Sequence, residues 1–234
     1  MPRKREGGRN MAIAGNSCSE IAFHIGHASI ASPMHSNEDY TKSKLIESGC
    51  LLALADGIGG AAFGDALSHV AVNSSLSYAT NHPIEDAFYL TYEKVAEFTD
   101  LLDSQGSGCS LILGRLDQTS SVLTLVWAGD TIAFLSREGR LNRLCEPFRI
   151  EGTNCLSNCL GAPQKFVPGF LELELHEGDR IMLCSDGVWD SLPKEALASI
   201  LDKPLSPPIL AGMVVDKASR HSSDDCTALI VECE

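Results

Sequence analysis

Residues 52–60 read Leu-Ala-Leu-Ala-Asp-Gly-Ile-Gly-Gly, an apolar run that ends on an aspartate and is followed by glycines. The apolar residues from Cys50 to Ala55 predict a buried strand, so we expect Asp56 at the tip of that strand. A single Asp-Gly pair is more often an ordinary turn than part of a binding site. Gly59 and Gly60 favour a binding site here, because they let a backbone carbonyl approach a metal ion where a Cβ atom would hinder it.

Three further acidic clusters lie along the chain. Of these three and the cluster at Asp56, three sit at the end of an apolar run or just before one. The further clusters are Asn37-Glu38-Asp39, Ser185-Asp186-Gly187 and Asp224-Asp225-Cys226-Thr227. Strand tips from two sheets can converge at one rim, where ionised carboxylates repel one another unless a cation neutralises them. Oxygen ligands without a nearby Cys/His set favour Mg²⁺ or Mn²⁺ over zinc.

The remaining pattern predicts an α+β protein in which two sheets pack on each other with helices outside. Two segments of helical period lie between the second and third strand-like runs, and shorter helices are expected to start at Pro193 and Pro208. Helices grouped in pairs argue against an alternating βαβ repeat with a parallel sheet. The segment 152–168 is expected to be an irregular loop. The strand-like runs are 21–26, 50–55, 109–114, 121–127, 131–135, 170–175, 180–184 and 227–231. The helical faces carry Phe63, Leu67 and Val70, then Ile84, Phe88, Thr91, Val95, Phe98 and Leu102.

Composition and charge indicate a single domain. The 234 residues, 44% of them hydrophobic, are enough for one buried core. The 31 acidic and 18 basic residues give a formal net charge of −13, which disfavours nucleic acid and anionic membranes as partners. No apolar run is long enough to span a bilayer, and no signal peptide is recognisable. We expect a cytoplasmic monomer with a disordered tail at residues 1–16 and one domain at residues 17–234.

The nine cysteines predict reduced thiols rather than disulfides or a zinc site. Their number is odd, and most of them stand beside apolar residues, which suits buried thiols in a cytoplasm. Cys155 and Cys159 are the only close pair, and no CxxC motif or suitably spaced His accompanies them.

Six motifs, taken together and in order, resemble those of the metal-dependent protein phosphatase family, the type 2C Ser/Thr phosphatases, in its compact bacterial branch. The resemblance runs from about Ile21 to Val231, and one such motif alone would mean little. It implies a four-layer αββα sandwich of two mainly antiparallel sheets between helix pairs. The motifs are Asn-Glu-Asp at 37–39, the stretch 52–60, Gly-Ser-Gly at 106–108, Ala-Gly-Asp-Thr-Ile-Ala-Phe-Leu at 128–135, Gly-Asp-Arg-Ile-Met-Leu-Cys-Ser-Asp-Gly at 178–187, and Asp-Asp-Cys-Thr at 224–227.

The resemblance also implies which residues hold two divalent cations, Mn²⁺ or Mg²⁺. Asp56 would bridge both cations, and Gly57 would supply a backbone carbonyl. Asp186 and Asp224 would hold the first cation, and Glu38 the second, directly or through water. Such a pair lowers the pKa of a shared water for attack on phosphorus, so no protein nucleophile is needed.

Three more aspartates receive supporting roles from the same resemblance. Asp39 would orient waters on the metals, and Asp225 would take the place of the family's usual Asn behind the ligands. Asp130 would contact a third, weaker cation that it shares with Asp186.

The chain departs from the family pattern at the substrate phosphate. The family's Arg, four residues before the Glu, is Met34 here. A charge-assisted hydrogen bond is worth about 1.5–3 kcal/mol, so its loss is expected to raise KM without removing the metals. The adjacent His35 can partly replace the Arg when protonated, although a lone His in a loop is more often simply solvated. Ala61 and Ile58 stand where relatives have a His, so no general acid is assigned.

A second departure is the short segment between Leu144 and Leu160, where the family has a longer flap beside the active site. We expect a more open site and recognition through a partner surface.

Three functions compete for this sequence. We favour hydrolysis of phosphoserine and phosphothreonine in a phosphorylated protein, with a Ser/Thr kinase or its target as a partner. The first alternative is a weak or inactive relative that serves as a regulatory or binding module, for which Met34 is the evidence. The second is an acidic cation-binding or structural protein, which leaves the ordered motifs unexplained.

Overall fold

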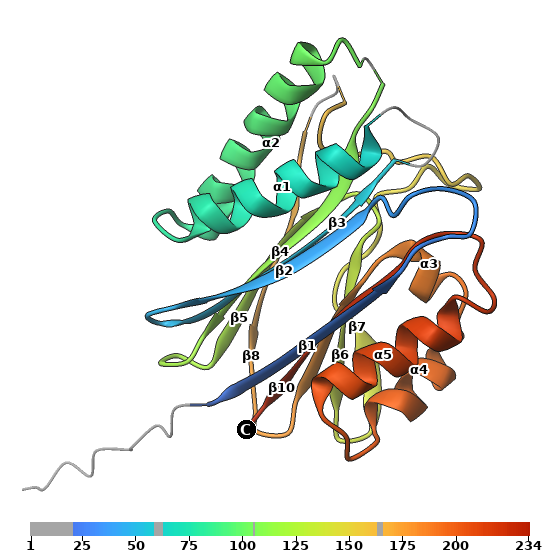
Figure 1. Cartoon of the computed structure of the whole chain (residues 1–234). Helices are drawn as coiled ribbons and strands as arrows, with labels where there is room; N and C mark the ends of the chain where they lie inside the picture. Colours follow the sequence, from blue (N-terminus) through green and yellow to red (C-terminus); the bar gives the residue numbers. More distant parts are fainter. Residues whose placement is uncertain (1–20, 59–62, 105, 163–165) are drawn as a thin grey trace, which may run out of the picture.

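The computed structural model describes residues 21–58, 63–104, 106–162 and 166–234, and these form two five-stranded antiparallel sheets packed face to face (Figure 1). The first sheet has the order β2 (Asp39–Ile46), β3 (Gly49–Gly57), β4 (Cys109–Asp117), β5 (Val122–Ala128) and β8 (Gly169–Glu174). The second has the order β1 (Phe23–Ile30), β10 (Cys226–Cys233), β9 (Arg180–Cys184), β6 (Ile132–Arg137) and β7 (Arg140–Arg143).

Helices cover the outer faces of both sheets (Figure 1). The first sheet carries α1 (Gly64–Ala79) and α2 (Ile84–Leu101). The second carries α3 (Asp186–Trp189), α4 (Lys194–Leu201) and α5 (Pro207–Ala218). The predicted α+β fold, a four-layer αββα sandwich, is confirmed. No helix in the described parts of the chain is both long and apolar enough to cross a membrane.

Strand β3 explains why an unbroken apolar run precedes Asp56. Successive side chains of a strand point to opposite faces of the sheet, and both faces of β3 are covered. Leu52 and Leu54 belong to the core cluster that includes the second sheet, whereas Leu51 and Ala53 belong to the cluster with α1 and α2. Asp56 points to the same face of the sheet as Leu52 and Leu54, because alternate residues of a strand share a face. It therefore lies on the inner side of the sandwich, at the rim.

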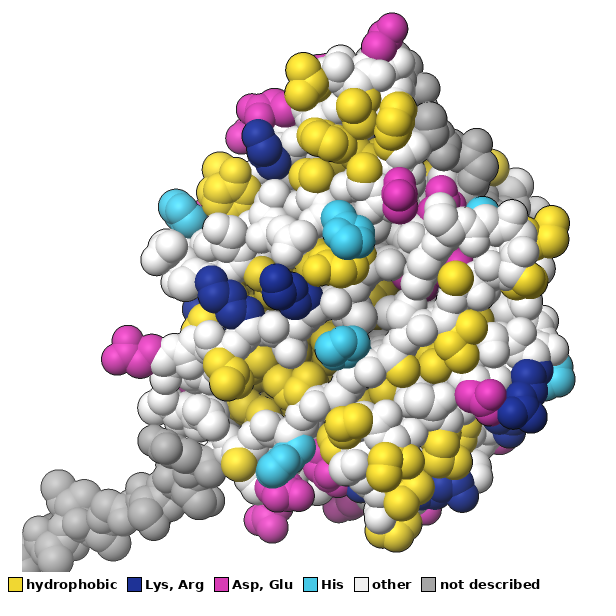
Figure 2. All heavy atoms as spheres, viewed as in Figure 1, with side chains coloured by type: hydrophobic (Ala, Val, Ile, Leu, Met, Phe, Trp, Pro, Cys, Tyr) yellow, Lys and Arg dark blue, Asp and Glu magenta, His cyan; other side chains and the backbone are white. Residues whose placement is uncertain are grey.

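The eight strand-like runs all overlap strands, but two edge strands were not predicted. Strand β2 reads Asp-Tyr-Thr-Lys-Ser-Lys-Leu-Ile, and much of it is exposed. Basic side chains lie over this strand in Figure 2, as expected for an edge that must not pair with another chain. Strand β7 is only four residues long, with a single buried residue. Short or polar edge strands bury too little apolar surface to leave a clear pattern.

The helices begin close to the predicted positions, with one correction. Phe63 does not face the core: it precedes α1 with φ 68° and is 46% exposed. The buried face of α1 instead includes Leu67, Ala71 and Leu76. The single-turn helix α3 was not predicted, because four residues are too few to show a period.

Candidate metal centre

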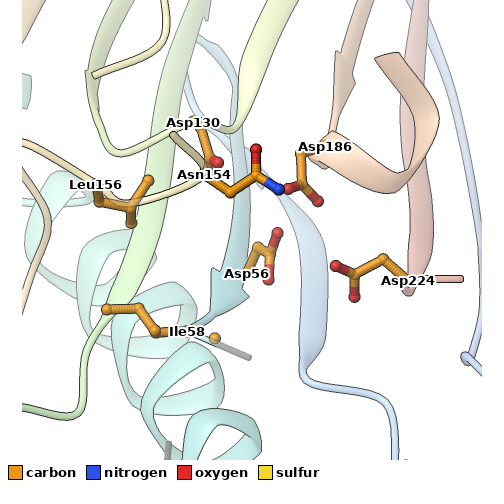
Figure 3. Close-up of a pocket in the computed structure, with 8 residues that line it drawn as sticks. Asp56, Ile58, Asp130, Asn154, Leu156, Asp186 and Asp224 are labelled. Atoms are coloured by element: carbon orange, nitrogen blue, oxygen red, sulfur yellow. The ribbon is translucent and has the colours of Figure 1, made fainter. Parts of the chain in front are cut away.

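Four aspartates line one cavity at the rim of the sandwich. Asp56 is the penultimate residue of β3, and Asp130 stands between β5 and β6. Asp186 is the first residue of α3, two residues after the end of β9, and Asp224 precedes β10 by two residues. Figure 3 shows the four carboxylates gathered around a pocket of about 210 Å³. Strand ends of both sheets therefore converge on one rim.

The aspartates at the centre of this cavity fit a hard divalent cation. One oxygen from each of Asp56, Asp130 and Asp186 lies within 4.8 Å of the other two. Asp186 Oδ1 is buried, and no donor in the described residues bonds to it. A buried carboxylate oxygen without a partner is costly unless it is protonated or binds a cation. An all-oxygen donor set of this kind suits Mg²⁺ or Mn²⁺.

The electrostatics of the cavity also call for a cation. Burial raises the pKa of Asp56 well above its ordinary value, and the charges of Asp39 and Asp186 add to the shift. Burial raises the pKa of Asp186 to about 7, with Asp130 as the next cause. Burial raises the pKa of Glu38 as well. The ionised forms of these carboxyls are therefore disfavoured without a cation, and cation binding would favour loss of their protons.

Asp39 lies behind Asp56. The two residues are direct partners in the β2–β3 ladder. Ser185 Oγ donates a hydrogen bond to Asp39 Oδ2 at 2.7 Å and accepts one from the Thr227 N–H at 3.0 Å. Asp39 Oδ1 is buried and has no hydrogen-bond partner within the described residues. Burial raises the pKa of Asp39 to about 7. Asp39 therefore offers one fixed oxygen and one free oxygen next to Asp56.

Asp225 fixes the segment that carries Glu38. Its Oδ1 accepts the Ser32 N–H at 2.6 Å, and its Oδ2 accepts the Glu38 N–H at 2.6 Å. The amide nitrogen of an Asn is a donor, so an Asn here could accept only one of these bonds. This explains an Asp where the family resemblance expects Asn. The Glu38 carboxylate packs against Gly64 at the start of α1, where a Cβ atom would come within 2.7 Å of Oε1.

Gly57 lies close against the start of α1. Its N–H donates to the Glu38 carbonyl at 3.1 Å, and a Cβ atom at Gly57 would lie 2.5 Å from the backbone of Gly64. Ile58 lines the cavity. The other residues singled out in this loop, Gly59, Gly60 and Ala61, lie outside the described residues.

His35 lies beside Asp224 and Asp225, and its neighbour Met34 is 80% exposed. Its Nε2 is 3.9 Å from Asp224 Oδ1, and its Nδ1 is 3.8 Å from Asp225 Oδ2. The pKa of His35 is raised, mainly by a hydrogen bond to the Ser36 carbonyl and further by Asp225, against the effect of burial. The structure therefore brings a His that favours its protonated form next to the predicted ligand Asp224.

Sequence reasoning missed Arg149, which lies among the acidic residues of the cavity. Its guanidinium forms ion pairs with Asp130, Asp186 and Asp190 at 2.7, 2.7 and 2.6 Å. Asn154 of the same loop lines the cavity with Asp56 and Asp186. One signal was available, because Arg149 is the only basic residue between Leu144 and Leu160.

The cysteines do not form a second reactive centre in the described structure. Seven of the eight described cysteines are buried, and only Cys155 among them is exposed. Burial raises the pKa of Cys184, which lies two residues before Asp186, well above its ordinary value. A buried neutral thiol is a poor nucleophile, so Cys184 contributes packing.

Comparison with known proteins agrees with this geometry. The sequence model of the family described as Stage II sporulation protein E (SpoIIE) matches residues 47–234. The "Serine/threonine phosphatase stp" of Listeria monocytogenes serotype 4b is 24% identical over 213 residues, covering 78% of this chain and 84% of that protein. "Probable protein phosphatase 2C 33" of Oryza sativa is 30% identical over 161 residues, covering 64% of this chain and 37% of that protein.

Solved structures show the same fold. The serine/threonine phosphatase of S. agalactiae superposes with a TM-score of 0.81 at 19% identity, covering 91% of this chain and 100% of that one. The catalytic domain of the phosphatase PstP, solved in complex with two manganese ions, has a TM-score of 0.77 at 23% identity and covers 91% and 99% of the two chains. The resemblance drawn from the ordered motifs is confirmed.

Proposed function

We propose that this chain, which belongs to the Stage II sporulation protein E (SpoIIE) family, is a metal-dependent protein Ser/Thr phosphatase. The observation that carries the proposal is the convergence of carboxylate oxygens from Asp56, Asp130 and Asp186 within 4.8 Å, with Asp186 Oδ1 buried and unpaired among the described residues. The relatives named as Ser/Thr phosphatases support the same reaction.

The chain's own residues supply the ligands and their support. Asp56 would contact both cations, Gly57 would offer its carbonyl, and Asp186, Asp224 and Glu38 would complete the set. When bound, two Mg²⁺ or Mn²⁺ ions activate a water for attack on phosphorus and offset charge on the phosphoryl oxygens.

Residues behind the ligands hold them in place. Asp39 is the partner of Asp56 in the β2–β3 ladder. Its Oδ1 has no hydrogen-bond partner among the described residues, so it can accept a hydrogen bond from a water on the metals and orient that water. Asp225 fixes the backbone of Glu38 through the bond from its N–H. The resemblance implies that Asp130 contacts a weaker third cation, but Arg149 pairs with the same carboxylate, so the ligand set proposed here is that of two cations.

We propose that His35 contacts the substrate phosphate in its protonated form, because its raised pKa favours that form and it lies beside Asp224. Met34 has no phosphate-binding group. We further propose that the protein acts on a phosphoprotein, through a partner surface beside an open site with a short flap. A Ser/Thr kinase would supply that phosphoprotein. We also propose a monomer in a reducing, cytoplasmic setting, which the burial of seven of the eight described cysteines supports.

The test is hydrolysis of a phosphothreonine peptide by the purified chain with Mn²⁺, with Mg²⁺ and with a chelator. We expect turnover with either metal and none with the chelator, because water alone is a weak nucleophile at neutral pH. Calorimetry on the same samples measures metal binding. Bound metal without turnover on peptides or phosphoproteins would instead support the regulatory or binding module.

Replacing Met34 with Arg is expected to lower KM for phosphopeptides by about 10- to 100-fold with little change in kcat, since a charge-assisted hydrogen bond contributes about 1.5–3 kcal/mol. Met34 is 80% exposed, so the longer side chain fits without repacking. Steady-state kinetics of Met34→Arg beside Met34→Gln, a neutral control of similar length, measure the effect. Equal KM values for the two variants would show that a charge at this position does not reach the substrate.

A further inference from the structure

Arg149 inserts a fixed positive charge between the carboxylates of the cavity. Its Nε donates to Asp130 Oδ2 at 2.8 Å, its Nη2 to Asp186 Oδ2 at 2.7 Å, and its Nη1 to Asp190 Oδ2 at 2.6 Å. Its side chain is only 14% exposed. A guanidinium keeps its charge at all relevant pH values and offers donors in a rigid plane, which suits several carboxylates at once.

The backbone around Arg149 is held in place by a small hairpin. Arg149 and Leu156 face each other in an isolated antiparallel bridge. The Phe148 N–H donates to the Gly129 carbonyl at 2.8 Å, and the Ile150 N–H donates to the Cys155 carbonyl at 2.8 Å. The hairpin is thus attached to the turn that carries Asp130.

The guanidinium is also held by Trp189 in α3. The centre of the guanidinium lies 4.6 Å from the centre of the indole ring, within the range of a cation–π contact. The indole Nε1 donates to the Asp130 carbonyl at 2.9 Å, so the same ring supports both partners of the ion pair. Arg149 is positioned from two sides, unlike an exposed surface ion pair.

The contacts divide the two oxygens of Asp186 between different partners. Oδ2 accepts the bond from Arg149, whereas Oδ1 is buried with no donor in the described part of the chain. Asp130 Oδ2 is also taken by Arg149. The space between Asp130 and Asp186 already holds a positive charge, while the other oxygen of Asp186 remains free for a cation.

We infer that Arg149 is a positioning residue that acts as a built-in cation between Asp130 and Asp186, so that the centre takes two metal ions instead of three. The inference rests on the proposed two-cation function. The guanidinium occupies the place where the resemblance puts a weak third cation. It offsets carboxylate charge at any metal concentration, and it holds Asp186 with one oxygen free.

The number of bound Mn²⁺ ions tests this role independently of catalysis. Equilibrium dialysis with metal analysis, together with the electron paramagnetic resonance signal of free Mn²⁺, is applied to the full chain and its variants. We expect two equivalents for the wild type and for Arg149→Lys. We expect three for Arg149→Met, with the third bound at least about tenfold more tightly than any third ion on the wild type, because a neighbouring positive charge is gone. Adding Asp130→Asn to Arg149→Met should return the count to two.

Arg143→Met is the matched control. Arg143 also stacks on Trp189, at 5.1 Å, but it pairs with Glu146 and not with a carboxylate of the cavity. We expect this variant to keep two equivalents with unchanged affinity. A third equivalent here would show that the effect comes from disturbing Trp189, and would overturn the inference.

Other outcomes would also overturn it. A wild-type chain that binds three ions and loses one on Asp130→Asn would show that Arg149 moves aside for a metal. A folded Arg149→Met protein that still binds two ions would show that Arg149 does not set the number of metal ions and forms only a structural ion pair. If Arg149→Met does not fold, the comparison of Asp130→Asn with the wild type is the test. The inference predicts that Asp130→Asn binds as many Mn²⁺ ions as the wild type. A wild type that binds no metal at all would contradict the proposed function itself, a result distinct from these.

Discussion

Asp56→Asn is expected to reduce phosphopeptide hydrolysis by at least about a thousandfold, the largest effect of any single substitution in this chain. Asp56 is the only proposed ligand shared by both cations, and an amide supplies one weaker oxygen in place of a charged carboxylate. The measurement is kcat/KM at saturating Mn²⁺, with metal affinity determined in parallel by calorimetry.

The same substitution is expected to stabilise the metal-free protein, which separates lost chemistry from lost structure. Burial raises the pKa of Asp56 well above its value in the unfolded chain, so ionisation of this carboxyl favours the unfolded state as pH rises. An Asn does not ionise, so the melting temperature measured in chelator should rise. Asp216→Asn is the control, because it removes a carboxylate paired with Arg220 on the exposed side of α5. Near wild-type turnover by Asp56→Asn would refute the bridging role.

The stability of the metal-free protein is expected to fall as pH rises from about 4 to about 7. Asp39 and Asp186 have pKa values near 7 in the folded state, above the usual unfolded value of about 3.9. Groups with a raised folded pKa contribute their stability below the unfolded pKa and lose it as pH rises through the folded pKa. The free energy of unfolding is expected to fall by an amount of the order of several kcal/mol. Asp39 and Asp186 interact, so their separate contributions do not simply add.

Cations should remove this dependence. Denaturant unfolding from pH 4.5 to 7.5, with chelator and with saturating Mn²⁺, measures it. Bound metal takes over the carboxylate charge, so the gain in stability on adding Mn²⁺ should grow with pH. A metal-free protein whose stability is flat or rises over this range would show that the carboxyls are ionised without a cation, contrary to the geometry.

The sequence predicted the architecture where strands are buried on both faces. Strand β3 is covered by α1 on one side and by the second sheet on the other, so its run of apolar residues is unbroken and its end is marked by Asp56. Sequence order alone did not place the four strand ends at one rim. That expectation came from the two-sheet architecture, in which Asp56 ends a strand of one sheet and Asp186 follows a strand of the other.

What the sequence did not predict depends on contacts distant in the chain. Arg149 looked like one charge in a short loop, and its role follows from partners 19, 37 and 41 residues away. Asp225 looked like a substitution for Asn until its two bonds to the backbone of Ser32 and Glu38 were seen, 193 and 187 residues away. Such pairings leave no periodic signal, because each is a single contact fixed by the tertiary fold.

The stacking of Trp189 on Arg149 gives the protein an optical reporter of its own centre. The chain has two tryptophans, and the other, Trp127, lies buried in β5 against Gly169. The indole of Trp189 is in contact with the guanidinium and bonds to the Asp130 carbonyl, so its emission depends on the charges beside it. Fluorescence titration with a colourless divalent ion can therefore follow occupancy of the centre without a label, and a Trp127→Phe background isolates that signal.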